Sequence, residues 1–589
     1  MEKEMAEPLI VISGGCIVSP LGTGTADNLA AIRAGRSALR PHAGHWPGVE
    51  PFVASLFDDA ELDALAAAET LPHTEYTRFE RLALLAAIRA VRESGIDAAA
   101  DDVLFILSST KGNVEILDAP NATQATVERS LLPDSATRIA AHFGNRNSPV
   151  CVCNACISGL AALITAARLL RSGRYRHAVV VGADSQSRFI VSGFQSFKAL
   201  SPQPCRPFDA LRDGLNAGEA AAAAVLSRKE AADAGPDEWV VTQGAIRNDA
   251  NHISGPSRTG EGSLRALRAT AGKAPCETLA FINAHGTATP YNDEMEAIAI
   301  ERAGLSALPV NSLKGYYGHT MGAAGILEVL LSAQAVERGF VPATRGFSRL
   351  GVSRPVQVSA TASHTERRAF LKLMSGFGGC NAALRLEQGA RDVPPHTTPV
   401  PAVCLHSMRL ESDGTVETGG ETHHYGERGS ALLTAIYRRE IGDYPKFFKM
   451  DPLCRLGFVA TELLLQGETG RFIPREDRAV VLFSHCGSLC NDLRYLRTIQ
   501  WPDAYYPSPS VFVYTLANIV TGEIAIRNRY YGETSCFLLQ DDTPDTEAAL
   551  IEAAWADPAT RSLVCGWIDC PDTEHFTARL QLLQRTDVP

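Results

Sequence analysis

The sequence predicts an α/β fold, and two observations lead to that prediction. Over the first 390 residues, apolar runs of strand length alternate with longer stretches rich in Ala and Leu, which is the order of elements in α/β proteins. Gly and Pro separate these segments, for example in SPQPCRPFD at 201–209. In chain order, the predicted strands are 9–14, 103–109, 178–184 and 279–286, and the predicted helices are 81–94, 157–172 and 323–336.

The chain is longer than one hydrophobic core usually allows, so we expect two domains in its 589 residues. The stretch 391–402 holds four prolines and no apolar periodicity, which is typical of an extended linker. It divides the chain into a first domain, 1–390, and a smaller α/β domain, 403–589. Strand-like runs at 478–484 and 562–569 predict that the second domain is folded.

Charge and composition exclude several classes of protein. The formal net charge is −11, so we expect no nucleic-acid partner. The sequence has no apolar run of 18 residues, and its N-terminus has neither a basic leader nor a cleavage site. We therefore expect no membrane span and a cytoplasmic protein. Fourteen cysteines are too few for a disulfide framework, so the thiols should be reduced.

Cys156, in CNACISG (153–159), follows an apolar run and precedes a long Ala/Leu-rich stretch. A cysteine at such a strand-to-helix turn lies where helix amides favour the thiolate, so we expect a lowered thiol pKa and a nucleophile. The alternative is a small buried residue at a helix start. A metal site with Cys151 and Cys153 is a further alternative. No CxxC pair or clustered His stands at zinc-site spacing, so we predict no metal site.

Two histidines and a glycine-rich turn stand in similar surroundings of small residues. His285 lies in NAHGTATP (283–290) and His319 in GHTMGAAG (318–325). A lone histidine is usually structural, but two in such turns suit thioester chemistry, in which they donate to a developing enolate and move protons. The turn GFGG (376–379) carries Phe377, whose amide would serve an oxyanion, although a simple tight hairpin is the alternative.

Together with ISGGCIVSPLGTG (12–24) and RPFDALRDGLNAGEA (206–220), these segments resemble the elongating, Cys–His–His type of β-ketoacyl-acyl-carrier-protein synthase, in the thiolase superfamily. The resemblance covers about residues 8–387. It implies a thiolase-like five-layered αβαβα fold and a decarboxylative Claisen condensation of acyl and malonyl thioesters in fatty acid or polyketide synthesis. The enzyme would need no cofactor of its own, because the acyl carrier protein brings the phosphopantetheine. It would form a homodimer or a heterodimer with a synthase-like subunit.

Carried over residue by residue, the resemblance makes Cys156 the acylated nucleophile and assigns decarboxylation to the two histidines. Lys314 would lie beside this triad with Glu296 as its acidic partner, and the amides of Cys156 and Phe377 would form the oxyanion hole. Thr287 and Thr289 would line the path of the phosphopantetheine arm. The predicted catalytic residues are thus Cys156, His285, His319, Lys314, Glu296 and Phe377, and the predicted substrate-binding residues are Thr287, Thr289 and Lys111.

Lys111 departs from the family, which commonly has an apolar residue of the acyl pocket at the place of STKGN (109–113). A charged side chain in an alkyl tunnel is costly unless it is paired or solvated. Ordinary saturated chains are therefore less suitable, and we expect a polyene or aryl polyene substrate. A second departure is Cys380 in GFGGC, where Thr is usual and only packing should change.

The second domain resembles a diverged copy of the first part of a synthase. Setting Gly182 on Gly566 aligns the strands and places Cys156 on Gln540, so we expect a catalytically silent half-domain that docks on the first. Such a half-domain should leave apolar faces that need a partner. Two functional alternatives remain open. One is a thiolase or acyltransferase that condenses without decarboxylation, and the other is a chain-length-factor-like, non-catalytic partner of another synthase.

Overall fold

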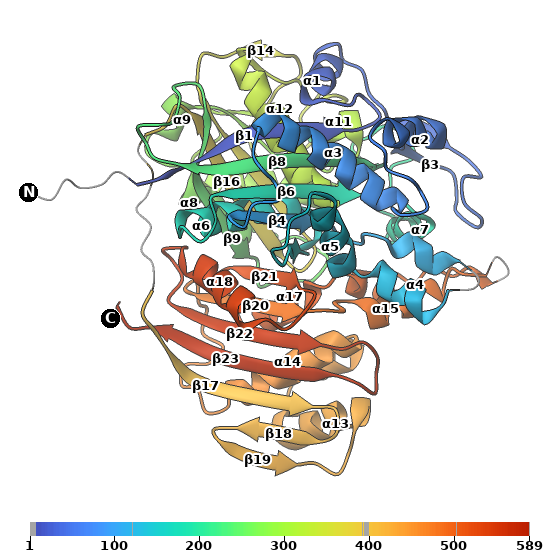
Figure 1. Ribbon diagram of the computed structural model, residues 1–589, viewed down its shortest axis with the longest axis vertical. Helices are drawn as coiled ribbons and strands as arrows, with labels where there is room; N and C mark the ends of the chain where they lie inside the picture. Colours follow the sequence, from blue (N-terminus) through green and yellow to red (C-terminus); the bar gives the residue numbers. More distant parts are fainter. Residues whose placement is uncertain (1–6, 120–121, 392, 394–399, 502–503, 588–589) are drawn as a thin grey trace, which may run out of the picture.

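The computed structural model describes residues 7–119, 122–391, 393, 400–501 and 504–587. The predicted linker, 391–402, falls mostly outside these described residues. We call residues 7–391 the first region and residues 400–587 the tail. Figure 1 shows the tail, in orange and red, lying beneath the first region.

The first region contains two sheets with the same strand order. One sheet runs β1 (Leu9–Val18), β8 (Ala220–Lys229), β6 (His177–Asp184), β4 (Val103–Ser108) and β5 (Val150–Val152). The other runs β9 (Trp239–Asn248), β16 (Cys380–Gln388), β15 (Ala369–Gly376), β10 (Leu279–Asn283) and β11 (Pro309–Asn311). In each sheet the first three strands are antiparallel and the rest parallel, so the region consists of two related halves.

Helices form the remaining layers. α6 (Ser158–Arg171) and α12 (Ala324–Glu337) are buried almost along their whole length, as expected of helices that are apolar on most sides, and lie between the sheets. α3 (Arg78–Ser94) covers the outer face of the first sheet, where it contacts β1, β8 and β6, and α8 (Glu261–Thr270) covers that of the second (Figure 1). The predicted five-layered fold is therefore confirmed.

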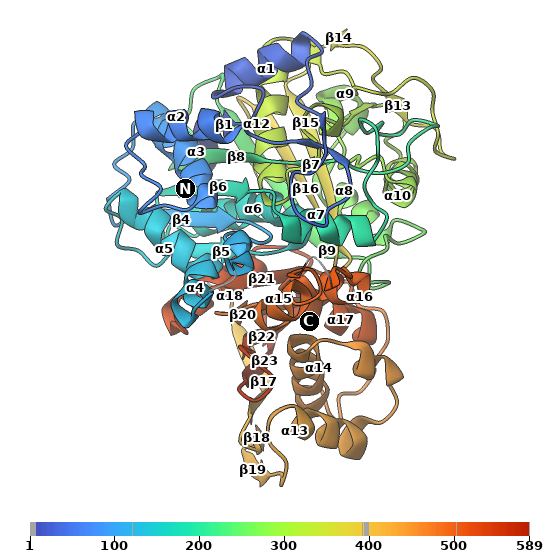
Figure 2. The ribbon, with the colours of Figure 1, turned by 90° about the vertical axis from the view of Figure 1, so that its right-hand side faces the viewer.

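The tail repeats the first half of this plan. Its sheet runs β17 (Ala402–Glu411), β23 (Thr577–Arg585), β22 (Ser562–Asp569), β20 (Arg478–Ser484) and β21 (Thr534–Leu538), with the strand directions of the first sheet. A hairpin of β18 (Thr415–Thr418) and β19 (Glu421–His424) extends it beyond β17. Figure 2 shows this sheet nearly edge-on, with α13 (Gly429–Ile436) and α14 (Pro452–Leu464) on one side.

The sheet of the tail and the β1–β5 sheet of the first region join through their last strands. β21 pairs antiparallel with β5, with Phe537 opposite Val152, and the Cys153 amide donates to the Cys536 carbonyl at 3.1 Å. Because Val152 and Phe537 hold the same place in their own sheets, the junction has local two-fold pseudosymmetry. The tail therefore sits on the first region as a second, related subunit would.

The structure corrects the alignment of the tail with the first region. Ser108 and Phe483 hold the same place, because each is followed by a serine whose hydroxyl binds an aspartate. Ser108 is opposite Gly182 and Phe483 is opposite Trp567, so Gly182 corresponds to Trp567 and not to Gly566. The hydrogen bonds agree, since Ser109 binds Asp184 at 2.8 Å as Ser484 binds Asp569 at 2.7 Å. A slip of one residue would turn every side chain to the opposite face. Counting from β21, the place of Cys156 falls on Asp541, and the prediction of Gln540 was wrong.

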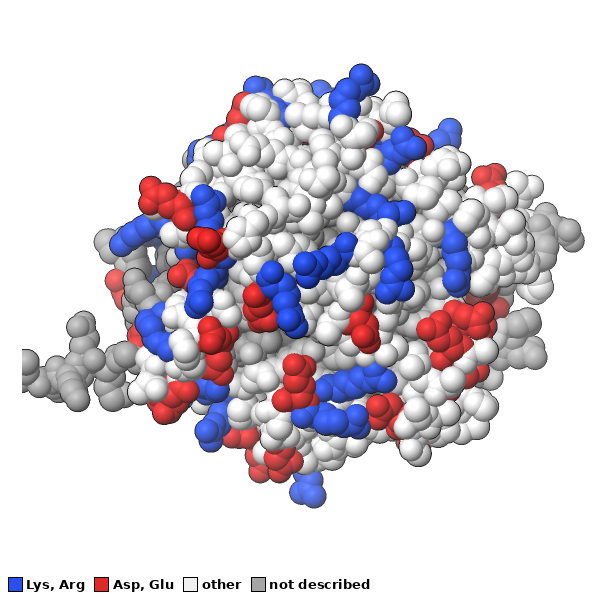
Figure 3. Space-filling model, turned by 90° about the horizontal axis from the view of Figure 1, so that it is seen from above, with Lys and Arg blue, Asp and Glu red and all other residues white. Residues whose placement is uncertain are grey.

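The surface farthest from the tail carries charges of both signs. Figure 3 shows Lys and Arg side chains interspersed with Asp and Glu over the described residues of this face. Within the described part of the chain, no single helix has the length and apolar composition needed to cross a membrane. One pair of helices bent by 99°, at 509–515 and 519–528, passes this test by length and composition only.

Candidate active site

Cys156 lies at the turn between strand β5 and helix α6. Ala155, just before it, has a φ of +48°, and a single turn of 3-10 helix, Ala155–Ile157, leads into α6. The Ser158 hydroxyl closes this turn by donating to the Ala155 carbonyl at 2.6 Å and accepting from the Asn154 amide at 2.8 Å. Cys156 is half-buried as a residue and lines a cavity of about 400 Å³.

The fold brings the three predicted catalytic side chains together. The sulfur of Cys156 and one ring nitrogen each of His285 and His319 lie within 4.8 Å of one another. The two imidazole rings are 5.0 Å apart between centroids and inclined by 80°. Each side chain follows a different strand, which is why residues far apart in the sequence meet at one edge of the paired sheets.

The hydrogen bonds of His319 fix its tautomer. The Met321 amide donates to His319 Nδ1 at 3.2 Å, so in the neutral ring Nε2 carries the proton. Nε2 is buried without a partner among the described residues, and His319 lines the cavity. Burial, and then the charge of Lys314, hold the pKa of both histidines well below its usual value. At neutral pH, His319 is therefore a hydrogen-bond donor.

The pKa of Cys156 differs from the sequence expectation. Burial raises the pKa of the thiol to about 12, although Lys314 and hydrogen bonds from the amides of Cys156 and Phe377 oppose this. The expectation that helix placement would lower it was wrong, because loss of solvation outweighs the favourable amides. A thiol is then the resting form, and a base must take its proton. Of the two neutral imidazoles, His285 is the one whose tautomer is not fixed by a backbone donor.

Lys314 is buried beside the triad, but its acidic partner is not Glu296. Its Nζ lies 2.5 Å from Glu328, on α12, and Lys372, on β15, binds the other oxygen of the same carboxylate. Glu296 instead accepts the backbone amides of His285 and Gly286 at 2.6 and 2.7 Å. The predicted pair Lys314–Glu296 was therefore wrong, since Glu296 holds the His285 turn.

Glu328 and Lys372 escaped the sequence analysis, although the sequence carries a signal for both. Glu328 interrupts the apolar helix segment GILEVLL, and Lys372 interrupts the apolar strand AFLKLMSG. A charge in a buried element requires a partner, so these two residues predict each other. Burial lowers the pKa of Lys372 to about 8, and its ammonium also donates to the Ala284 carbonyl at 3.1 Å, next to His285.

The remaining predicted residues lie around the same cavity. Thr287, Thr289 and Phe377 line it, and the hydroxyls of the two threonines are 2.9 Å apart. The tail completes the wall, which the sequence analysis did not foresee. The tail residues that line the cavity are Phe512, Thr515 and Leu516.

Lys111 lines the cavity as predicted, and its charge is paired. Its Nζ lies 2.7 Å from both carboxylate oxygens of Asp492, in the tail, and 3.2 Å from the Ser488 hydroxyl. Thr110 and Lys111 also border a second, smaller cavity of about 30 Å³. The Lys111–Asp492 pair therefore stands between the two cavities.

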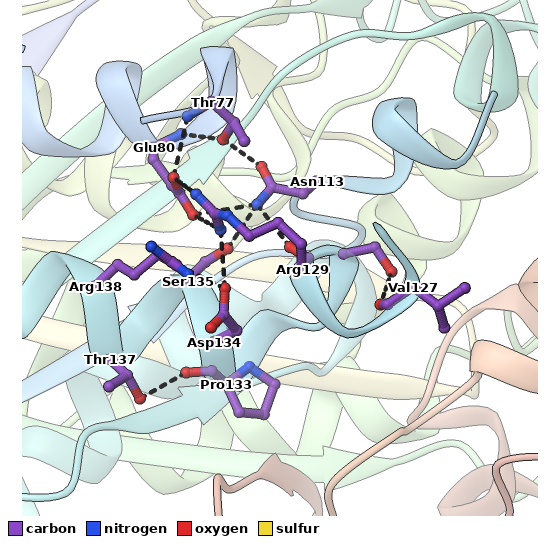
Figure 4. Close-up of polar contacts among 11 residues, drawn as sticks. Thr77, Glu80, Asn113, Val127, Arg129, Pro133, Asp134, Ser135, Thr137 and Arg138 are labelled. Atoms are coloured by element: carbon purple, nitrogen blue, oxygen red, sulfur yellow. Dashed lines mark hydrogen bonds and ion pairs between the residues drawn. The ribbon is translucent and has the colours of Figure 1, made fainter. Parts of the chain in front are cut away.

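Buried polar side chains hold the loop that carries Lys111 (Figure 4). Asn113 donates to Glu80 at 3.2 Å and to the Ser135 hydroxyl at 2.9 Å, and Arg129 neutralises Glu80. Thr77, which caps α3, donates to the Asn113 side-chain carbonyl at 2.5 Å. Because Glu80 is fully buried, the network holds the loop at Asn113, two residues after Lys111.

Comparison with protein families decides the identity of this arrangement. The sequence profile of the "Beta-ketoacyl synthase, N-terminal domain" matches residues 7–232, and that of the "Beta-ketoacyl synthase, C-terminal domain" matches residues 239–348. The chain belongs to the β-ketoacyl synthase family. It is accordingly an acyltransferase of the kind that forms carbon–carbon bonds in fatty acid and polyketide biosynthesis.

Curated relatives match about two thirds of this synthase. The ketoacyl synthase alpha subunit of the tetracenomycin polyketide synthase from Streptomyces glaucescens is 31% identical over 424 residues, covering 64% of this chain and 96% of the relative. The 3-oxoacyl-[acyl-carrier-protein] synthase 2 of Rhizobium meliloti is 30% identical over 417 residues, covering 64% and 98%. Each match covers 64% of the chain, which is about the share that the first region makes up.

Solved structures extend the likeness to the tail. The ketosynthase ApeO in complex with its chain length factor ApeC, from Xenorhabdus doucetiae, matches 65% of this synthase and 98% of that chain, with 27% identity and a TM-score of 0.55. The PfaC keto synthase–chain length factor matches 99% of this synthase and 79% of that chain, with 15% identity and a TM-score of 0.72. The second likeness shows that the fold of the whole chain, tail included, has a solved counterpart.

Proposed function

We propose that this β-ketoacyl synthase extends an acyl group held on Cys156 by a two-carbon unit from malonyl-acyl-carrier protein. The observation that carries the proposal is the meeting of one thiol and two neutral imidazoles in one cavity. A thiol supplies the nucleophile for transacylation. An uncharged imidazole can donate an N–H hydrogen bond to a developing enolate, and burial disfavours the charged imidazolium form.

The proposed reaction has two stages. The Cys156 sulfur attacks the acyl thioester, its proton passes to His285, and the carrier thiol leaves with a proton. The malonyl thioester then loses carbon dioxide, and the enolate accepts a hydrogen bond from His319 Nε2–H. Its carbon attacks the acyl group on Cys156, the carbon–sulfur bond breaks, and a β-ketoacyl chain is left on the carrier. The Cys156 thiolate that is expelled takes a proton from solvent and becomes a thiol again. The amides of Cys156 and Phe377 would stabilise the tetrahedral oxyanion.

Mass spectrometry of the intact protein after incubation with a series of acyl-carrier proteins tests this proposal. We expect a single acyl adduct on Cys156, no adduct in Cys156→Ala, and no chain extension by that variant. Release of labelled carbon dioxide from malonyl-carrier protein separates this reaction from a condensation without decarboxylation. A Cys156→Ala variant that still extends acyl chains would contradict the proposal, and failure of the wild type to acylate Cys156 would favour a non-catalytic partner.

We further propose that the tail takes the place that a chain length factor subunit occupies beside other synthases. Support comes from the β5–β21 junction, which uses the strand edge on which a related subunit would pair. The tail occupies that edge, so a homodimer or heterodimer through β5 is not needed. Light scattering on the purified chain should give the mass of one chain at low micromolar concentration. A stable dimer that dissociates on charge substitutions in β5 would overturn this proposal.

The substrate class we propose is a polyene or aryl polyene acyl chain. Support comes from Lys111, which lines the cavity with its charge paired to Asp492, and we propose that a stiff conjugated chain would end against this pair. The double variant Lys111→Ile/Asp492→Leu should accept saturated chains longer than the wild type does, without leaving a buried charge. An unchanged acyl preference across a chain-length series would place the pair outside the acyl path.

A further inference from the structure

The loop at 376–379 lies against Cys156, since a Cβ on Gly376 would be 3.2 Å from the Cys156 amide nitrogen, and the Phe377 amide opposes the rise in the pKa of the Cys156 thiol. Gly378 and Gly379 have φ values of +90° and +71°, a region that glycine adopts most readily. Glycines also leave the backbone more conformations than any other residue. The direction of the Phe377 amide therefore depends on the groups that hold this loop from outside.

A residue of the tail holds the loop directly. Asn518, at the start of helix α17 (Ile519–Asn528), donates from Nδ2 to the Phe377 carbonyl at 2.8 Å, and the same nitrogen lies 3.6 Å from Cys380 Sγ. One turn later, a Cβ on Gly522 would lie 2.5 Å from the Gly378 carbonyl oxygen, so the helix and the loop are in backbone contact. Asn518 is 1% exposed, which excludes water from this contact.

The contact between Asn518 and the loop at 376–379 carries a cost in folding stability. The Asn518 side-chain carbonyl is buried with no partner among the described residues. Leaving a buried acceptor unsatisfied costs about 1–3 kcal/mol in general. An apolar side chain at this position would avoid that cost, so the donor group itself has a use. Its hydrogen bond to the Phe377 carbonyl is the use that the geometry offers.

The next carbonyl of the loop is linked to the tail through an intermediary. Asn248, on β9, donates from Nδ2 to the Gly378 carbonyl at 2.9 Å and to the hydroxyl of Thr534, on β21, at 3.0 Å. Aromatic rings also link the loop to the tail. The ring centroids of Phe377 and Phe197 are 5.8 Å apart, and those of Phe197 and Phe512, in the tail, are 6.1 Å apart. The loop thus rests on the tail at its backbone and at its side chain.

We infer that Asn518 is a positioning residue, through which the tail sets the oxyanion hole of the first region. Holding the Phe377 carbonyl restricts the dihedral angles of Phe377 and so the direction of its amide. An oxyanion donor works only within about 2.7–3.1 Å of the developing charge, and a displacement of about 1 Å costs up to about a hundredfold in rate. The inference rests on the proposed roles of Cys156 and of the Phe377 amide.

The two half-reactions should respond unequally. Acylation of Cys156 passes through a tetrahedral oxyanion that needs the Phe377 amide. Decarboxylation of malonyl-carrier protein develops its charge beside the histidines, which Asn518 does not touch. A residue that only stabilises the fold would impair both half-reactions alike, so their ratio distinguishes positioning from stability.

The test uses the full chain with Asn518→Leu, which removes the donor and keeps the size of the side chain. Acylation of Cys156 is followed by intact mass, and decarboxylation is followed in a Cys156→Gln background with and without the substitution. We expect acylation to slow by about tenfold to a hundredfold and decarboxylation to change less than about twofold. Asn518→Ser, which keeps a short donor, should recover part of the acylation rate and replaces the Leu variant if that fails to fold.

Asn528→Leu is the matched control. It removes a buried asparagine at the other end of α17, whose Nδ2 donates to the Ile524 carbonyl at 3.0 Å, and it should leave the ratio of the two rates unchanged. A folded Asn518→Leu variant that acylates at the wild-type rate would overturn the inference, as would equal losses in both half-reactions. Failure of the proposed function would look different, because the wild type itself would then not acylate Cys156.

Discussion

The ion pair between Lys111 and Asp492 gives a direct measure of how firmly the tail is docked. Both side chains are nearly buried, with 6% and 13% of their surface exposed, and they come from different regions of the chain. Breaking a buried pair by removing one partner costs about 3–5 kcal/mol, because it strands a charge. Burial already raises the pKa of Asp492, although Lys111 opposes this, so Lys111→Ile should raise that pKa further.

We therefore expect Lys111→Ile and Asp492→Leu each to destabilise the protein by about 3–5 kcal/mol, and the double variant to recover most of that loss. The double variant leaves no stranded charge and adds apolar contacts to Phe189, whose ring now lies 5.5 Å from Lys111 Nζ. Urea unfolding, followed by a probe in the tail, supplies the four free energies of a double-mutant cycle.

The reasoning fails if the coupling energy of the cycle is below about 0.5 kcal/mol, the level at which distant sites add. It also fails if Lys111→Ile is as stable as the wild type at neutral pH. The pH dependence of the unfolding free energy gives a second test. The Asp492 carboxyl of Lys111→Ile should protonate at higher pH than in the wild type, so the stability deficit should shrink as the pH is lowered towards 5.

Three further predictions concern pH, the buried ionic contacts and the tail. The pKa of His285 and of His319 is held down in the folded state, so below about pH 6.5 only the unfolded chain binds protons at these two residues. The free energy of unfolding should therefore fall as the pH decreases in this range, and it should fall less steeply in the His285→Gln/His319→Gln variant. Asp557→Asn should lower stability by about 3–5 kcal/mol in urea unfolding, since it leaves Arg247, now 2.5 Å from Asp557, and Arg168 with less countercharge. A 1–390 chain should lose Cys156 acylation by intact mass even where it stays folded, and full acylation by that fragment would show that the tail contributes nothing to the site.

The fold of the first region could be predicted because its signals are local. Alternation of apolar strands with Ala-rich helices such as α6 follows from period and composition, and short turns around Cys156 and His319 are visible as runs of small residues. The partners of buried charges could not be predicted in the same way. Lys314 lies 14 residues before Glu328 and 18 residues after Glu296, and sequence distance does not tell which carboxylate the fold turns toward it.

The register of the tail could not be read from sequence for a related reason. Two glycines at matching places, Gly182 and Gly566, suggested an alignment that is wrong by one residue. What the two sheets share is an aspartate at the end of a strand, which accepts hydrogen bonds from the backbone amides of the loop after the neighbouring strand. Asp184 binds the Thr110 amide at 3.1 Å and Asp569 binds the Cys486 amide at 2.8 Å. In the sequence alone, nothing distinguishes this aspartate from the other acidic residues, and its role is visible only when the pairing of the strands is known.

The tail also shows how half of a synthase remains stable without the other half. In the first region, the run of alanines in β8 is buried on both faces, because helices cover each side. The corresponding strand of the tail, β23, alternates instead, with Leu580 and Leu582 buried and Arg579 and Gln581 exposed. Arg579 is bound by Asp542 at 2.6 Å, so this face meets solvent with paired charge where a complete synthase has a second sheet of its own. On this face of β23, polar side chains therefore stand where an apolar face was expected. Exposed apolar side chains of the tail lie elsewhere, for example Val403 and Leu405 on β17, as expected of a half-domain that leaves part of its apolar surface uncovered.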